Sequence, residues 1–169
     1  MIFKSIINNK NDSLIMASEF IKSKAADKNF IENFIEIVNH LDERYEVKKK
    51  ALYHSDGRTV RFPIKFDVKN ILGMRQTADI VKKLWRHREC LELRIDSKYS
   101  HHRVIFFIHD DNIEPSVVLS YGFTKINEQS NTDLTDLSAA ETDVISKEVH
   151  ISISKKIFWI GDKTNEYRF

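Results

Sequence analysis

The chain has 169 residues, of which 41% are hydrophobic and 31% charged, with four Gly and two Pro. This size and composition are typical of one globular domain that can bury its own core, so we expect a single domain over residues 1–169. The formal net charge of +2 does not indicate a general affinity for nucleic acid. Any anion site must therefore come from local clustering of Lys, Arg and His.

Signals for export, membrane insertion or disulfide bonding are weak in this sequence. Cys90 is the only cysteine, which excludes an intrachain disulfide, and we interpret it as a small buried residue rather than a nucleophile. No apolar run approaches the roughly 20 residues that span a membrane. The first residues, MIFKSIINNKNDS, lack the apolar centre and cleavage site of a signal peptide. We therefore predict a cytoplasmic protein with no membrane contact.

The N-terminal part predicts a strand followed by a helical hairpin. "IFKSIIN" at 2–8 is typical of a strand, and Asp12 or Ser13 can cap the helix that follows. Asn29 and Glu32 resemble the capping box of a second helix. Its apolar residues recur at helical spacing: Phe30, Phe34, Ile37, Val38, Leu41 and Tyr45. The short joint predicts a hairpin over 13–46, with this stripe packed on a sheet.

Residues 47–86 predict a β-hairpin and then a helix. A Ser-Asp-Gly turn at 55–57 separates two stretches that can be strands, and Pro63 makes the second one short or an edge strand. The spacing of Ile80, Val81, Leu84 and Trp85 predicts a helix at about 75–86.

From residue 90 the apolar pattern has a period of two, which predicts three antiparallel strands over 90–126. In the first of them Leu91, Leu93 and Ile95 point one way, and Glu92, Arg94 and Asp96 the other. A weakly amphipathic helix is expected next, carrying Leu137, Ala140, Val144 and Ile145. The alternation in "VHISISKKIFWIG", 149–161, predicts an edge strand, and we expect the last eight residues to be mobile. The fold class predicted from these elements is α+β.

Arg94 and Arg103 each lie in an apolar stretch of a predicted strand. A guanidinium group keeps its charge in a protein, so each arginine beside a core needs a partner. That partner is either a carboxylate of the same chain, such as Glu92, or a phosphate from another molecule. The residues alone leave both possibilities open.

Three segments between residues 81 and 137 carry a resemblance to a known family: "VKKLWRHRECLELRI", "HHRVIFFIHD" and "VVLSYGFTKINEQSNTDL". Their order resembles the RelE/ParE superfamily of bacterial toxins, in its HigB-like, phage-derived branch. Tyr121 stands where the branch commonly has His, His102 where it has an aromatic residue, and Lys125 where it has paired lysines. Against this family, residues of about 47–75 are an insertion and those of about 149–169 a C-terminal extension.

The resemblance implies a RelE-like fold, with an N-terminal strand and helical hairpin packed on a curved antiparallel sheet. It also implies an endoribonuclease that cleaves mRNA, usually in the ribosomal A site, and is held inactive by an antitoxin of the helix-turn-helix kind. Cleavage of this kind uses the 2′-hydroxyl and needs no metal or cofactor, and the histidines show no metal-ligand spacing. A small-molecule ligand is not expected.

On this interpretation Arg94 and Arg103 hold the phosphate and Lys125 adds charge. His101, His102 and Tyr121 are the candidates for proton transfer, Tyr121 only if nearby cations lower its pKa. The structural alternatives are an internal ion pair for Arg94, a solvated Lys125, surface histidines, and a core Tyr121 with the strand parity of Val117 and Leu119. Two other functions also remain: a ParE-like toxin that binds DNA gyrase, and a non-toxic regulatory relative. The trio of Arg94, Arg103 and Lys125 favours the nuclease.

Overall fold

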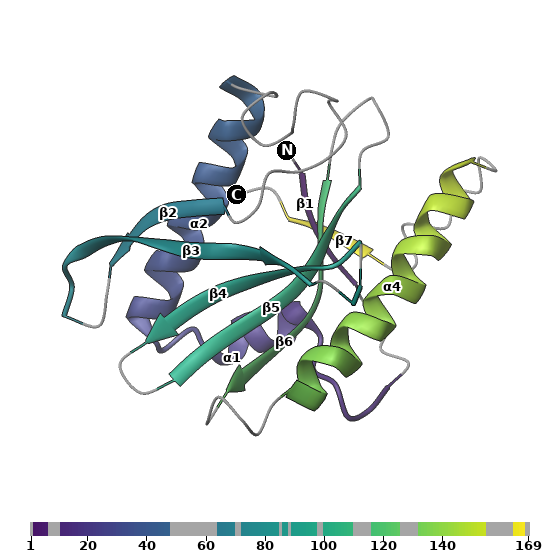
Figure 1. The fold of residues 1–169 in the computed structure, drawn as a ribbon, viewed down its shortest axis with the longest axis horizontal. Helices are drawn as coiled ribbons and strands as arrows, with labels where there is room; N and C mark the ends of the chain where they lie inside the picture. The colour runs from purple at the N-terminus through teal and green to yellow at the C-terminus, as the bar shows by residue number, and fades with distance from the viewer. Residues whose placement is uncertain are drawn as a thin grey trace.

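The computed structural model describes residues 2–6, 11–47, 64–69, 72–84, 86–87, 89–97, 100–109, 116–125, 132–154 and 164–167. Strands and helices are mixed along the chain, which confirms the α+β class (Figure 1). The elements are β1 (Ile2–Ile6), α1 (Ala17–Ser23), α2 (Lys28–Val47), β2 (Ile64–Lys69), β3 (Arg75–Lys83), β4 (Leu91–Ser97), β5 (Ser100–His109), β6 (Ser116–Lys125), α4 (Thr132–Ser154) and β7 (Thr164–Tyr167).

Within the described ranges seven strands form one sheet, in the order β2-β3-β4-β5-β6-β1-β7. The strands from β2 to β6 pair with one another in antiparallel order, so the predicted meander over β4, β5 and β6 is present. β1 lies between β6 and β7, parallel to the first and antiparallel to the second. The sheet therefore joins the N-terminal strand to the strands of the C-terminal half.

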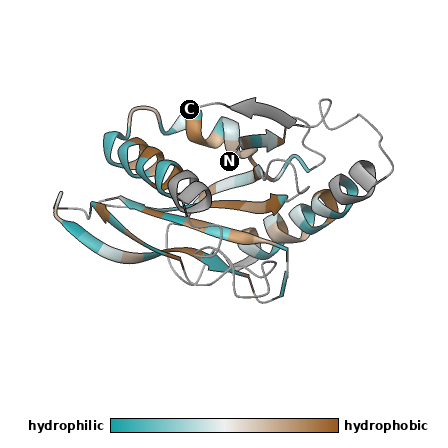
Figure 2. Cartoon of the chain, turned by 90° about the horizontal axis from the view of Figure 1, so that it is seen from above, coloured by the Kyte–Doolittle hydropathy of each residue, from teal (hydrophilic) through white to brown (hydrophobic). Residues whose placement is uncertain are grey.

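One face of the sheet packs against the helical hairpin. The stripe on α2 contributes Phe30, Phe34, Val38 and Leu41 to a cluster with Leu91, Leu93, Val104 and Phe106 of the sheet, and all eight are buried. This is the packing that the helical spacing and the two-residue period predict. Figure 1 shows strands crossing in front of α1 and α2, and in Figure 2 the central strands carry the hydrophobic colour. Burial of this apolar area is the main stabilising term for the domain.

The opposite face packs against α4. Ile105 and Phe123 cluster with Ala139 of α4 and with Cys90, and Phe107 packs in a second cluster on this side. Polar contacts supplement this packing, since the Ser120 and Thr142 hydroxyl oxygens lie 2.7 Å apart in the interior. Nowhere in the described part of the chain is a helix long and apolar enough to cross a membrane.

The second helix begins two residues earlier than a cap at Asn29 predicts. Asp27, rather than Asn29, caps α2, because its Oδ1 accepts a hydrogen bond of 3.0 Å from the Phe30 N–H. Asn29 instead donates from its side-chain amide to the Asp96 carbonyl, over 3.3 Å. The α1–α2 joint is thereby fixed to the end of β4.

The helix predicted at about 75–86 is wrong, since Arg75–Lys83 forms strand β3. β2 pairs Ile64 with Val81 but Lys65 with Asp79, so Ile80 is an extra residue at an irregularity in the ladder. Ile80 and Val81 consequently both lie in the hairpin-side core. Two adjacent buried residues break the two-residue period, which is why the segment resembles a helix in sequence.

The C-terminal part also differs from the prediction. Residues 149–154 continue α4 instead of starting a strand, and the edge strand is β7 at Thr164–Tyr167, within the segment that was expected to be mobile. The predicted turn at 55–57 and Pro63 lie outside the described residues. β2, which follows them, is a short strand at the other end of the sheet order, as expected of an edge strand.

We predict that Gly122→Ala destabilises the protein by about 1–3 kcal/mol, because an added Cβ overpacks this site. That Cβ would overlap Cδ1 of Phe20 and lie 2.7 Å from its Cβ, so α1 would have to move. Urea unfolding measures the loss. In the Gly122→Ala background Phe20→Leu should cost less than in wild type, and strictly additive losses would show that the two residues do not clash.

Candidate functional site

Six charged residues of β4, β5 and β6 lie on the sheet face opposite the helical hairpin. The pairing register places Arg94 beside Arg103, Asp96 beside His101, and His101 beside Lys125. Since neighbours across a ladder share a face, strand alternation brings these side chains to one surface. We call this group the arginine cluster: Glu92, Arg94, Asp96, His101, Arg103 and Lys125.

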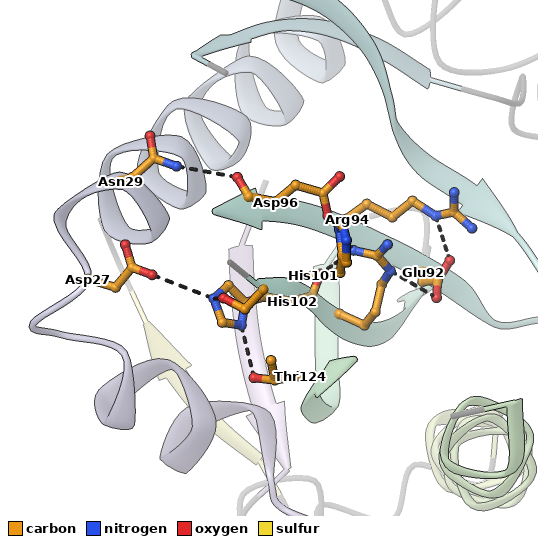
Figure 3. Close-up of polar contacts among 10 residues, drawn as sticks. Asp27, Asn29, Glu92, Arg94, Asp96, His101, His102 and Thr124 are labelled. Carbon is orange, nitrogen blue, oxygen red and sulfur yellow. Dashed lines mark hydrogen bonds and ion pairs between the residues drawn. The ribbon is translucent and has the colours of Figure 1, made fainter. Parts of the chain in front are cut away.

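The centre of the cluster is the carboxylate of Glu92, a residue only 1% exposed. Arg94 Nε donates to its Oε2 over 2.7 Å, and Arg103 Nε lies 3.6 Å from its Oε1 (Figure 3). Two arginines directly opposite each other on neighbouring strands would otherwise repel. Glu92 therefore compensates both, and Arg94 does form the internal ion pair that the sequence left open.

The two arginines differ in how much of each guanidinium group remains available. Arg103 is 9% exposed, and its Nη1 donates to Asp96 Oδ1 over 2.9 Å and to the His102 carbonyl over 2.7 Å. The Arg94 side chain is 31% exposed and uses Nε for Glu92. Among the described residues neither Nη of Arg94 has a hydrogen-bond partner. Arg94 thus presents an open donor pair at the surface, which suits a phosphate or carboxylate.

His101 and Asp96 form the exposed edge of the cluster. His101 Nδ1 lies 2.9 Å from Asp96 Oδ1, the same oxygen that accepts from Arg103. Burial raises the pKa of Asp96, but the hydrogen bonds from Arg103 and His101 outweigh this effect and hold the pKa below its ordinary value. At neutral pH the carboxyl group is therefore ionised between two cationic or ionisable neighbours.

His102 lies on the other face, among the residues of the helical hairpin. Its Nδ1 is 3.0 Å from Thr124 Oγ1, and its Nε2 is 2.9 Å from Ser100 Oγ and 3.6 Å from Asp27 Oδ2 (Figure 3). The ring is 5.0 Å from that of Phe30. Burial, followed by the nearby Lys24, lowers the pKa of His102. Of the two adjacent histidines, only His101 belongs to the arginine cluster.

Tyr121 is a core residue, 1% exposed. Burial, with a smaller contribution from Glu141, raises its pKa to about 12, so the expectation that cations lower this pKa is wrong. The ladder between β5 and β6 shifts register after Ile105. Tyr121 consequently packs on the α4 side with Phe107, and does not share the face of Val117 and Leu119.

Cys90 is fully buried, as interpreted from the sequence. Its thiol donates to the Ala139 carbonyl over 3.3 Å and to Asp143 Oδ1 over 3.1 Å, while Asp143 Oδ2 lies 2.9 Å from His87 Nδ1. Burial raises the pKa of Cys90 far above its ordinary value, which disfavours the nucleophilic thiolate. In the described ranges no three His, Cys, Asp or Glu side chains converge to hold a metal ion.

Sequence reasoning missed Asp96 as a partner of Arg103 and His101, and Asp27 as a partner of His102. A signal for the first was present, because the two-residue period already put Glu92, Arg94 and Asp96 on one face. The second depends on a contact between the α1–α2 joint and β5, which are far apart in sequence.

We predict that Glu92→Gln costs about 3–5 kcal/mol of unfolding free energy, because it removes the buried carboxylate between Arg94 and Arg103 and leaves Arg103 dependent on the half-exposed carboxylate of Asp96. Glu32→Gln is a matched control, since Glu32 pairs with Lys69 at 2.9 Å but both side chains are 40% exposed. Urea unfolding should show a much smaller loss for the control. Equal losses would mean that Glu92 is no more important than a surface carboxylate.

We also predict that the protein loses stability as the pH falls below about 6.5, the unfolded pKa of His102. The folded pKa of His102 is the lower one, so the unfolded chain takes up the proton first. This stability is present above the unfolded pKa and is lost toward the folded pKa. Urea unfolding at about pH 7.5 and 5.5 should show the loss in wild type and less of it in His102→Gln. Replacing exposed His101 by Gln should retain it, and an unchanged loss in His102→Gln would contradict the assignment.

Comparisons with known proteins give no further identification. No family model, no curated protein and no solved structure shows a significant match to the chain. A function must therefore be inferred from the residues and their arrangement.

Proposed function

We propose that the chain is a toxin of the RelE/ParE superfamily, an endoribonuclease that inhibits translation by cleaving mRNA without a metal ion. The observation that carries the proposal is the arginine cluster. Three cations and a histidine from three consecutive strands share one face, and the cations outnumber the two carboxylates. The order of β1, the helical hairpin and an antiparallel meander supports the same family.

The proposed chemistry needs side chains that bind the phosphate and side chains that transfer protons. The two Nη atoms of Arg94 would bind two oxygens of the scissile phosphate, with Arg103 and Lys125 stabilising the charge of the transition state. The 2′-oxygen bonds to phosphorus, its proton passes to a base, and the P–O5′ bond breaks as that oxygen is protonated. His101 is the group in the cluster suited to proton transfer near neutral pH. In the free protein Asp96 holds the ring through its contact with Nδ1.

The proposal includes two macromolecular partners besides the mRNA. The ribosome would present the mRNA, and an antitoxin would cover the arginine cluster. Acidic groups of such an antitoxin would complement Arg94 and Lys125.

One observation favours a second candidate, a relative of this fold that does not cleave RNA. Glu92 and Asp96 already neutralise Arg103 and part of Arg94, so the cluster can be a structural network within the sheet. A gyrase-binding toxin or a regulatory relative would then act through another surface. The two candidates differ in whether Arg94 has a role beyond stability.

We predict that Arg94→Lys reduces mRNA cleavage roughly 100- to 1000-fold, as expected for loss of a preorganised donor, while the melting temperature changes little. Lysine keeps a charge for Glu92 but lacks the planar fork. Arg103 is less suitable for this test, because its side chain is buried. Its replacement would also destabilise the fold, so a loss of activity would not be separable from unfolding.

The matched control is Arg75→Lys on β3, where the arginine is 62% exposed and pairs with Glu36. Translation-coupled cleavage and thermal unfolding are measured on both variants, and the control should retain activity. A folded Arg94→Lys protein that cleaves like wild type would leave only the structural role. A wild-type protein inactive on mRNA, with and without ribosomes, would contradict the nuclease itself.

A further inference from the structure

Asp96 holds a position in the arginine cluster that resembles that of a bound anion. Its Oδ1 lies 2.9 Å from both Arg103 Nη1 and His101 Nδ1. An oxygen held jointly by a guanidinium group and an imidazole is the arrangement expected of a phosphate oxygen. The carboxylate therefore occupies the place where these two side chains would receive a phosphodiester.

The partners of this contact differ in how easily each can leave it. The Asp96 side chain is 54% exposed, whereas that of Arg103 is 9% exposed. Arg103 is also held by the His102 carbonyl and lies beside Glu92. Rotation of Asp96 would return its charge to water at small cost, while Arg103 would remain in place.

Arg103 is also incompletely satisfied. Its Nε is buried and, within the part of the chain that the structure describes, has no hydrogen-bond acceptor, since the Glu92 oxygen is 3.6 Å away. An isolated buried donor of this kind is rare in folded proteins, and its cost is relieved when an acceptor approaches. An anion with several oxygens could satisfy more of this guanidinium group than the one Asp96 oxygen does.

We propose that Asp96 is an internal competitor for a phosphodiester, occupying its place on Arg103 and His101 until the bound RNA displaces it. This inference rests on the proposed function, because it specifies how the same site is kept closed. The open form is then a minor state, and the apparent affinity for RNA is reduced by its population. Displaced Asp96 would also stop accepting from His101, which frees this ring nitrogen when RNA is present.

The test measures binding without cleavage. A fluorescent 2′-O-methyl oligoribonucleotide cannot supply the attacking hydroxyl, and its affinity is read from anisotropy in the absence of ribosomes. Asp96→Asn and Asp96→Ala should each bind it about tenfold more tightly than wild type if the open form is about one tenth populated. Melting temperatures show that the variants remain folded. The gain should shrink when His101→Gln is added, because one of the two donors is then absent.

Asp79→Asn is the matched control for net charge. Asp79 is on β3, 39% exposed and 3.7 Å from Lys65, so its replacement removes the same charge away from the cluster. It should leave the affinity almost unchanged. Equal gains for Asp79→Asn and Asp96→Asn would reflect general electrostatics and would overturn the inference, as would unchanged or weaker binding by both Asp96 variants.

The two proposals can fail separately. Tighter binding by the Asp96 variants, with no cleavage by any protein, would support the competitor role and reject the nuclease. Cleavage by wild type, with binding that does not respond to Asp96, would support the nuclease and reject the competitor role.

Discussion

The polar half of the sheet depends on the contact between Glu92 and the two arginines. Arg94 and Arg103 are direct neighbours across β4 and β5, an arrangement that like charges disfavour. A carboxylate that is 1% exposed makes it tolerable, since Glu92 approaches both guanidinium groups through different oxygens. The three charges are therefore one structural unit. A ligand that binds at this surface therefore meets arginines that already pair with carboxylates of their own chain.

The rest of the domain follows from strand alternation around this unit. Residues of β4 and β5 that alternate with the charged ones pack in the core against α2. The same strands therefore have one apolar face and one polar face. A one-residue slip in strand pairing would move every side chain of a strand to the opposite face. Burial of the apolar residues of β4 and β5 against α2 and the ion pairs of the arginine cluster therefore favour the same register. Residues remote from the cluster, such as Phe30 and Phe34, are therefore as important for its geometry as its own members.

The sequence was sufficient where the pattern is local. The stripe of α2 and the alternation over 90–97 predicted both the hairpin packing and the charged face. It fails where pairing between strands shifts register. The spacing around Ile80, at the β2–β3 irregularity, is typical of a helix, and the parity of Tyr121 with Val117 predicts the face opposite to the one that Tyr121 occupies after the β5–β6 shift. It also could not separate His101 from His102, whose roles depend on contacts with Asp96 and Asp27. Such contacts are set by tertiary structure, which no local period contains.

The position of β1 inside the sheet has a consequence for biosynthesis. This strand pairs with β6 through Ile2↔Ser116 and with β7 through Ile6↔Thr164, so β1 meets its partners only when more than a hundred further residues have been translated. Pairing over such sequence distances slows folding, because the chain loses the entropy of closing a long loop before the stabilising contacts form. We therefore expect the complete sheet to form only after synthesis has passed β7, the partner of β1 at the sheet edge.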